Sequence, residues 1–130
     1  MANPNIVNLS SITGNTTYYT PSGTTAVVLL TNASSSNTVY KINNIVAANV
    51  TGSAVAATVS IYTNGSVAQG SAPSGGTAYP IIYQVSVPAN AAAVVVDKST
   101  TFYLQEGTCI SITSGTSSAI TYTVSYEVLS

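Results

Sequence analysis

The amino-acid sequence predicts an all-β fold, a two-sheet antiparallel β-sandwich of eight or nine strands. Apolar and polar residues alternate with a period of two in four segments, and no segment shows the 3.6-residue period of a helix. The alternating residues are mainly β-branched or aromatic, which suits a pleated sheet. Two packed sheets are the simplest way to bury so many alternating faces. Jelly-roll and immunoglobulin-like strand orders both stay open, because alternation does not determine which strands are neighbours.

The last stretch of the chain, Ala119–Leu129, carries the strongest strand signal. Apolar residues occupy the even positions from Ile120 to Val128, and polar residues occupy the odd positions between them. Such a strand is roughly 30–36 Å long at about 3.3 Å per residue. It needs a whole sheet beside it. Since 130 residues are enough for one domain and few for two, we expect one domain that spans residues 1–130.

The beginning of the chain contains less regular signals. Residues 1–5 are expected to form a flexible arm, because Pro4 prevents regular structure. Ile6–Ile12 fits a short edge strand, and the glycine, asparagine and proline residues of Thr13–Thr24 predict a loop. Thr25–Thr31 is apolar on both faces, so we expect a strand that is central or covered by a neighbour.

The middle of the chain predicts a long hairpin. Thr38–Val50 and Ala54–Thr63 are strand-like and are separated by the tight turn Thr51–Ser53. Asn43-Asn44 interrupts the first strand and predicts a β-bulge. The residues of that strand expected to share one face are Tyr40, Ile42, Val46, Ala48 and Val50.

A long loop and several shorter strands follow. Residues 64–78 contain Asn-Gly, Gly-Gly and Ser-Ala-Pro-Ser without any periodicity. A loop of this length is usually functional or mobile, and it is not expected to bury itself, so we expect a partner contact there. The segments predicted as strands after the loop are Tyr79–Val87, Ala91–Val96, Thr101–Leu104, Cys109–Thr113 and Ala119–Leu129. The residues predicted to form the core are Tyr122, Val124, Tyr126, Ile110, Ile112, Val59 and Ile61.

The chain is almost free of charge. Its charged residues make up 4% of the sequence, against about 25% in ordinary soluble domains. Weak electrostatic repulsion suits a protein whose surface is covered by neighbours in an assembly, although a merely uncharged soluble protein would look the same. With two basic residues in all, both of them lysines, the chain offers no basic patch, so a nucleic-acid partner is not expected.

The sequence lacks the residues of the common catalytic and metal sites. There is no histidine, which excludes Ser-His-Asp and Cys-His arrangements, and Cys109 reads as a small apolar residue. The carboxylates Asp97, Glu106 and Glu127 read as turn and surface residues rather than a catalytic pair or a metal site, and Lys98 reads as a solvated neighbour of Asp97. We therefore expect no enzyme, no catalytic residue, no metal and no cofactor.

No targeting or membrane signal is expected either. The first residues lack a charged head followed by an apolar core, and the longest apolar run, Ala91–Val96, is too short to cross a bilayer. The expectation is synthesis in a cytoplasm, where the protein stays soluble or assembles, without a membrane. Glycosylation is not expected at the sequons, which begin at Asn8, Asn15, Asn32, Asn49 and Asn64.

A further set of motifs lies at Met1–Asn8, Tyr40–Asn43, Val87–Ala89, Val96–Lys98, Phe102–Ile110 and Val124–Glu127. Together these motifs resemble those of small virion structural proteins of tailed bacteriophages, commonest in phages of cyanobacteria and other aquatic bacteria. The resemblance covers most of the chain and is weakest at residues 64–78. It implies a component of the virion and implies no catalytic residue.

The leading hypothesis is a non-enzymatic virion protein that decorates or cements the capsid. The alternative within this class is a tail, neck or fibre component. The expected partners are other phage capsid or tail proteins and further copies of the chain in a closed homo-oligomer, with a trimer favoured by the resemblance. A carbohydrate-binding β-sandwich is the alternative from another class, with Tyr18, Tyr19, Tyr62 and Tyr79 as residues that could stack on sugar rings.

Overall fold

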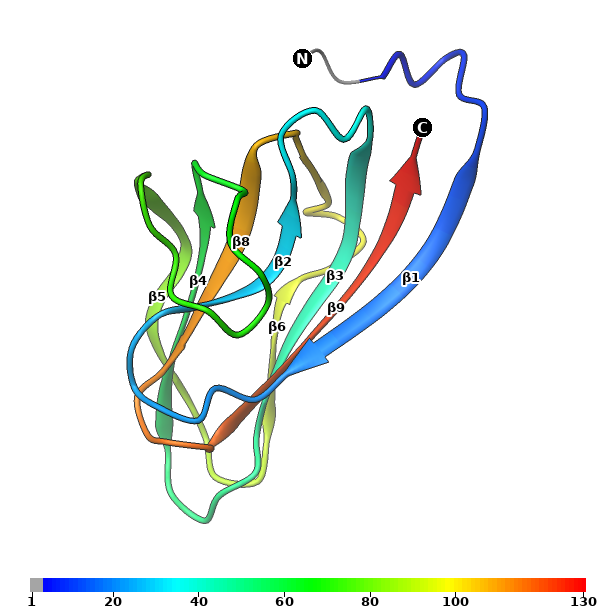
Figure 1. Cartoon of the computed structure of the whole chain (residues 1–130). Helices are drawn as coiled ribbons and strands as arrows, with labels where there is room; N and C mark the ends of the chain where they lie inside the picture. The colour runs from blue at the N-terminus through cyan, green and yellow to red at the C-terminus, as the bar shows by residue number, and fades with distance from the viewer. Residues whose placement is uncertain (1–3) are drawn as a thin grey trace.

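The computed structural model describes residues 4–130, and these form an all-β domain (Figure 1). No helix occurs among them, and the predicted two-sheet antiparallel sandwich is confirmed. The nine strands are β1 (Ile12–Tyr19), β2 (Val27–Asn32), β3 (Val39–Asn49), β4 (Val55–Tyr62), β5 (Ala78–Val87), β6 (Ala92–Val96), β7 (Phe102–Leu104), β8 (Thr108–Ser114) and β9 (Ile120–Leu129).

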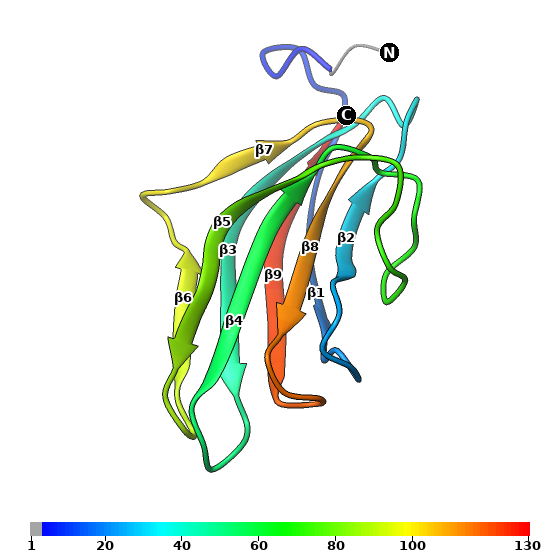
Figure 2. The same cartoon turned by 90° about the vertical axis from the view of Figure 1, so that its left-hand side faces the viewer.

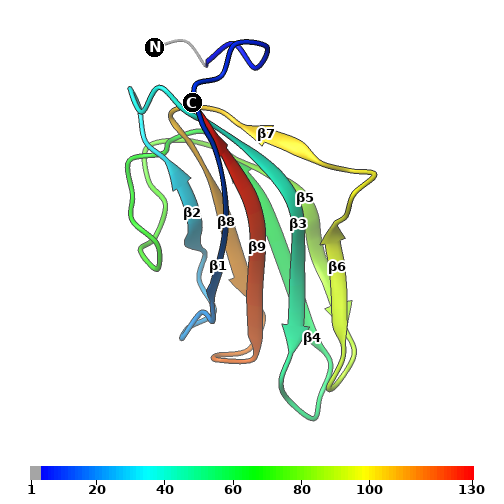
Figure 3. The same cartoon turned by 90° about the vertical axis from the view of Figure 1, so that its right-hand side faces the viewer.

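The strands form two antiparallel sheets that lie face to face (Figures 2 and 3). The first sheet has the order β1-β9-β3-β6, with β7 also paired to β3, and the second has the order β2-β8-β4-β5. When β6 and β7 are counted as one interrupted strand, this is the strand order of a jelly roll. The structure thus decides between the two topologies that the alternation pattern left open.

The prediction for the beginning of the chain was wrong. Ile6–Ile12 does not form a strand apart from its last residue, and the first strand is instead β1, which begins at Ile12 and otherwise lies within the segment predicted as a loop. All eight residues of β1 pair in register with β9, so the ladder overrides the turn preference of Gly14 and Asn15. The first three residues of the predicted arm, residues 1–5, lie outside the described part of the chain. Pro4 lies beside Val39 and Tyr103 of the first sheet.

The predicted hairpin over residues 38–63 was also wrong. Strands β3 and β4 begin and end close to the predicted limits, but they belong to different sheets, and the turn at Thr51–Ser53 connects the two layers. Alternation looks the same in a hairpin and in two strands that face each other across a sandwich, so the pattern could not separate them.

The bulge in β3 was predicted correctly, but its effect on the buried face was not. The pairing with β9 shifts between Ile42 and Asn44, which inserts one residue and reverses the face of every later side chain. Ile45 and Ala47 are therefore buried, whereas Val50 is 61% exposed. The expected inner positions Val46 and Ala48 lie on the outer side.

The core lies between the two sheets. Five of the seven predicted core residues are fully buried, Tyr126 packs against the core while partly exposed, and Ile61 is partly exposed and lies outside it. The largest fully buried side chains are Tyr122, Leu29, Ile42, Ile45, Leu104, Ile110, Ile112, Ile120, Val28, Val59, Val87 and Val96. The core thus draws on both sheets.

Two buried asparagines join the strands at the ends of the sandwich. The Asn32 amide donates to the carbonyl oxygens of Thr38 and Leu104, at 3.0 Å each, and its side-chain oxygen accepts from the hydroxyls of Ser36 and Thr38. Asn49 makes a similar set of bonds, donating to the carbonyl oxygens of Ser53 and Val87. The backbone carbonyl groups at these chain reversals lack a backbone donor. The two asparagine amides supply hydrogen bonds in its place.

The β4–β5 loop, residues 63–77, folds onto its own domain, contrary to the expectation that it cannot bury itself. Val67 packs on a small cluster formed by Val28, Tyr62 and Cys109 on the outer face of the second sheet. The N–H of Gly70 donates to the carbonyl oxygen of Val28 at 2.8 Å, and the N–H of Val28 donates to that of Ser71 at 2.9 Å. The second apolar face of β2 is thus covered within the chain.

We expect Val124→Ala to lower the free energy of unfolding by about 1–3 kcal/mol, through lost burial and the cavity that remains. Val124 is fully buried on β9, whereas its neighbour Thr123 points to the other side and is partly exposed. Thr123→Ala is the matched control and should cost much less. Denaturant unfolding of both variants measures the difference, and equal costs would show that both faces of β9 are buried in solution.

Candidate functional site

The three carboxylates are placed on three different elements. Asp97 lies in the β6–β7 turn, where hydrogen bonds from the Ser99 hydroxyl and N–H lower the pKa of its carboxyl. Glu106 lies in the β7–β8 connection and accepts a hydrogen bond from the N–H of Asn37. Glu127 lies on β9. Among residues 4–130 no three acidic, cysteine or histidine side chains gather in a way that could hold a metal ion.

Cys109 is enclosed between the second sheet and the β4–β5 loop. Its thiol donates to the carbonyl oxygen of Asn64 at 3.3 Å, and burial raises the pKa of the thiol to about 11. A thiol in this state is a poor nucleophile. Cys109 therefore packs as a small apolar residue.

The four tyrosines proposed for sugar stacking do not form a common platform. Tyr18 and Tyr79 are 69% and 60% exposed, but Tyr18 lies on β1 of the first sheet and Tyr79 on β5 of the second. Tyr19 packs against the core, and Tyr62 is buried beneath the β4–β5 loop. Strands β1 and β5 are edge strands on opposite sides of the sandwich, as Figures 1 and 3 show.

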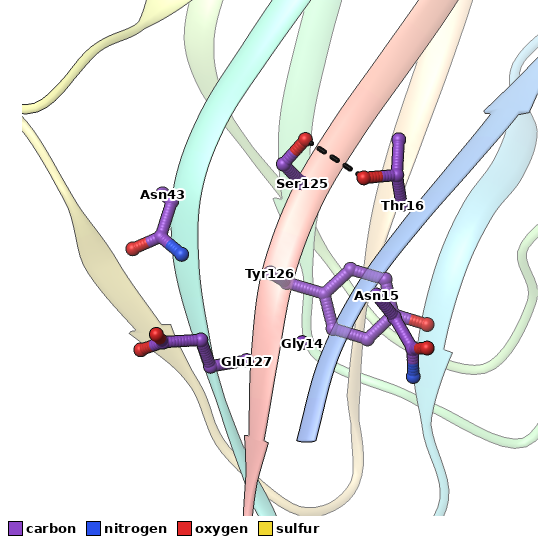
Figure 4. A pocket seen from close by; sticks show the side chains of 7 residues that line it. All are labelled: Gly14, Asn15, Thr16, Asn43, Ser125, Tyr126 and Glu127. Atoms are coloured by element: carbon purple, nitrogen blue, oxygen red, sulfur yellow. Dashed lines mark hydrogen bonds between the residues drawn. The ribbon is translucent and has the colours of Figure 1, made fainter. Parts of the chain in front are cut away.

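A shallow polar hollow of about 310 Å³ lies where β1, β9 and β3 run side by side (Figure 4). Gly14 contributes no side chain at the middle of β1, and the bulge in β3 displaces Asn43, so the two irregularities leave room between them. The residues that line the hollow are Gly14, Asn15, Thr16, Asn43, Ser125, Tyr126 and Glu127.

The hollow offers uncharged hydrogen-bonding groups and one carboxylate. The hydroxyls of Thr16 and Ser125 lie 3.0 Å apart and hydrogen-bond to each other. Glu127 stands opposite Lys41 in the ladder between β9 and β3. These groups can bind a hydroxylated or amide-bearing ligand, but none of them is an activated nucleophile. The sequence analysis missed this hollow, although a glycine within a strand next to a predicted bulge is a signal for it.

A second feature is an apolar surface at the end of the sandwich where the described chain begins. Ile6 and Tyr103 line a recess of about 180 Å³ together with Pro4, Val39 and Gln105. Ile6, Val7, Ile12 and Tyr103 are 51%, 83%, 62% and 48% exposed, and we call these four residues the N-terminal apolar end. These four are among the exposed large apolar side chains of a chain that is poor in charge.

Comparison of the chain with protein-family models, with curated proteins and with solved structures found no match. Within the described part of the chain, no helix is long and apolar enough to cross a membrane.

Proposed function

We propose that the chain is a non-enzymatic structural protein of a tailed-bacteriophage particle, where it decorates the capsid. Its partners are other capsid or tail proteins and further copies of itself, and its place is the virion, after assembly in the host cytoplasm. The motif resemblance supports this role, and so does the jelly-roll strand order, which recurs in viral capsid proteins. The fold-level support is an analogy, because one fold serves many functions.

The observation that carries the proposal is the composition of the surface. Only 4% of the residues are charged, and the exposed positions are mostly serine, threonine, asparagine and alanine, with scattered tyrosines and aliphatic residues. Such a surface gives little long-range repulsion and little selectivity by charge. It suits a subunit that is held against a shell through apolar and hydrogen-bonding contacts.

The N-terminal apolar end is the surface that we expect to face the shell. We predict that replacing Ile6 and Val7 together by serine reduces the binding of purified protein to particles that lack it at least tenfold. The two side chains are more than half exposed, so the fold should be spared. Cosedimentation with particles measures the binding.

The matched control for this prediction is Val94→Ser on β6, which removes a side chain that is 64% exposed elsewhere on the molecule. It should leave particle binding unchanged. Equal losses from both variants would show that general surface apolarity, and not the N-terminal apolar end, holds the protein on the particle.

A carbohydrate-binding module is the second candidate, and the polar hollow is the observation that favours it. Jelly rolls also occur in lectins, and sugar hydroxyls bind to carboxylate and amide groups such as those of Glu127 and Asn43. Against it, the aromatic side chains do not gather around the hollow; Tyr126 alone lines it. This candidate therefore stands behind the structural role.

A further inference from the structure

The two sheets have four edges when β6 and β7 are counted as one interrupted strand, and three of these edges are closed or interrupted. The edge of β2 is bonded to the β4–β5 loop through Val28. Strand β5 contains Pro80, and its register with β4 shifts twice. Strand β6 is short, and its register with β3 also shifts. Bulges, prolines, short strands and covering loops are the features that keep sheet edges from pairing with other chains.

The fourth edge, β1, has no bulge and no proline, and the β4–β5 loop contacts it only at its last residues, where the Gln69 amide donates to Thr17 and Tyr18. It pairs with β9 over all eight residues without a shift, and it contains no proline and no charge. Residues 12–16 are exposed on both faces of the strand. Figure 3 shows β1 beside β9 at one edge of the first sheet, and in Figure 1 it forms the outer side of the molecule.

The hydrogen-bond pattern identifies which backbone groups of β1 point outward. Ser11 and Ser130 exchange both of their N–H···O bonds just before the strand begins. In an antiparallel ladder such pairs alternate, so the odd residues from 13 to 19 bond to β9 and the even residues direct their N–H and C=O away from it. Consistent with this, the outward carbonyl of Tyr18 accepts a bond from the Gln69 amide at 3.4 Å. The outward groups of Ile12, Gly14 and Thr16 have no bond to any other described residue outside the ladder.

The outer face of β1 is complementary to itself. Its two large apolar side chains, Ile12 and Tyr18, are 62% and 69% exposed and stand three positions to either side of Asn15. An antiparallel pair of β1 strands with its two-fold axis at Asn15 places each Ile12 opposite Tyr18 of the other copy and each Gly14 opposite Thr16. The even residues then face one another, and the Gly14–Thr16 pairs can exchange both backbone bonds, whereas at the Ile12–Tyr18 pairs the other copy must share or displace the bond from Gln69 to the Tyr18 carbonyl. Aliphatic–aromatic pairs in such positions stabilise a sheet.

We propose that two copies of the chain pair through β1, antiparallel and centred on Asn15, so that the first sheet continues from one copy into the other. The absence of charge on β1 removes the like-charge repulsion that would oppose this pairing. The interface is two-fold and isologous, in contrast to the trimer that the resemblance suggested. This inference goes beyond the proposed role and does not depend on it, because purified protein should pair without any particle.

Sedimentation velocity of the purified chain should show a concentration-dependent equilibrium between one and two chain masses. Gly14→Lys should weaken the dimer at least tenfold, because a lysine on each copy would come close to the other across the edge. The substitution is tolerated within one copy, since a side chain at position 14 would meet nothing within 4 Å. Ser86→Lys places the same charge on the exposed, interrupted edge strand β5 and should leave the dimer unchanged.

A cysteine cross-link tests the position of the axis. In the proposed register the two Asn15 residues form a pair without backbone bonds, with Cα atoms about 4.5 Å apart, which is within the range of a disulfide. Asn15→Cys should therefore give a covalent dimer under oxidation, whereas Thr13→Cys should not. A chain that stays monomeric, a trimer, a dimer unaffected by Gly14→Lys, or equal cross-linking at both positions would overturn the proposal.

Discussion

Asn32→Leu is expected to lower the free energy of unfolding by about 3–5 kcal/mol, a large part of the stability of a small domain. The Asn32 side chain is fully buried and makes four hydrogen bonds. Leucine has nearly the same volume, but it leaves the carbonyl oxygens of Thr38 and Leu104 without the donor that the Asn32 amide supplies. Each buried group that loses its partner costs about 1–3 kcal/mol.

Asn44→Leu is the matched control for Asn32→Leu. Asn44 lies on β3 and is exposed, so the same change of chemistry should alter stability by less than about 0.5 kcal/mol. Denaturant unfolding followed by circular dichroism measures both variants. A small loss of unfolding free energy in Asn32→Leu would mean that water replaces the lost amide. It would also mean that Asn32 does not join β2 to the start of β3 and the end of β7.

Gly65→Ala is expected to release the β4–β5 loop and to cost about 2–4 kcal/mol. A methyl group at this position would lie 2.5 Å from the carbonyl oxygen of Asn32 and 2.7 Å from that of Thr108. Both are backbone atoms in paired strands, so the loop must move and not the sheet. Its displacement would uncover Val28, Tyr62 and Cys109.

The reactivity of Cys109 reports on this displacement. In the parent protein, burial raises the pKa of the thiol to about 11, so alkylation at neutral pH should be slow. Gly65→Ala should accelerate it at least tenfold, while Gly52→Ala, where a side chain would meet nothing within 4 Å, should leave both rate and stability unchanged. Unchanged reactivity in Gly65→Ala would show that the loop does not protect Cys109.

The sequence predicted the strands of the sandwich well from β3 onward, because period-two alternation is a local property of the chain. Ala119–Leu129, for example, was expected to be a strand, and β9 begins at Ile120 and ends at Leu129. Strand β1 was missed because its Gly14 and Asn15 favour turns, and only the ladder with β9 holds them extended. Pairing of residues so distant in sequence leaves no trace in local propensity.

The surface features depended on relations between strands and were harder to predict. Val28, Tyr62 and Cys109 show no relation to one another in the sequence until β2, β4 and β8 are placed side by side, and then they form the surface on which the loop packs. In the same way, the polar hollow requires Gly14 and the β3 bulge to lie across β9 from each other. The bulge itself was predictable from Asn43-Asn44, but its reversal of the later faces was not considered, which explains the wrong positions of Val46, Ala48 and Val50.

The docked loop also changes the argument for assembly. The apolar faces of β2 and the long loop were expected to need a second subunit, but each covers the other within one chain. The case for association now depends on the low charge, the N-terminal apolar end and the uninterrupted edge of β1. The two surfaces share Ile12, so particle binding is tested at Ile6 and Val7 and self-pairing at Gly14, each of which belongs to one surface alone.

Immunogold electron microscopy of purified particles, released from cells that produce this chain, tests the proposed role most directly. Capsid decoration predicts gold label in many copies over the particle head. Label confined to the tail, neck or fibres would contradict the capsid role and favour another place in the virion. Particles that carry no label at all would contradict the structural role. The carbohydrate-binding candidate, which is based on the polar hollow, would then be tested by the binding of the purified protein to glycans.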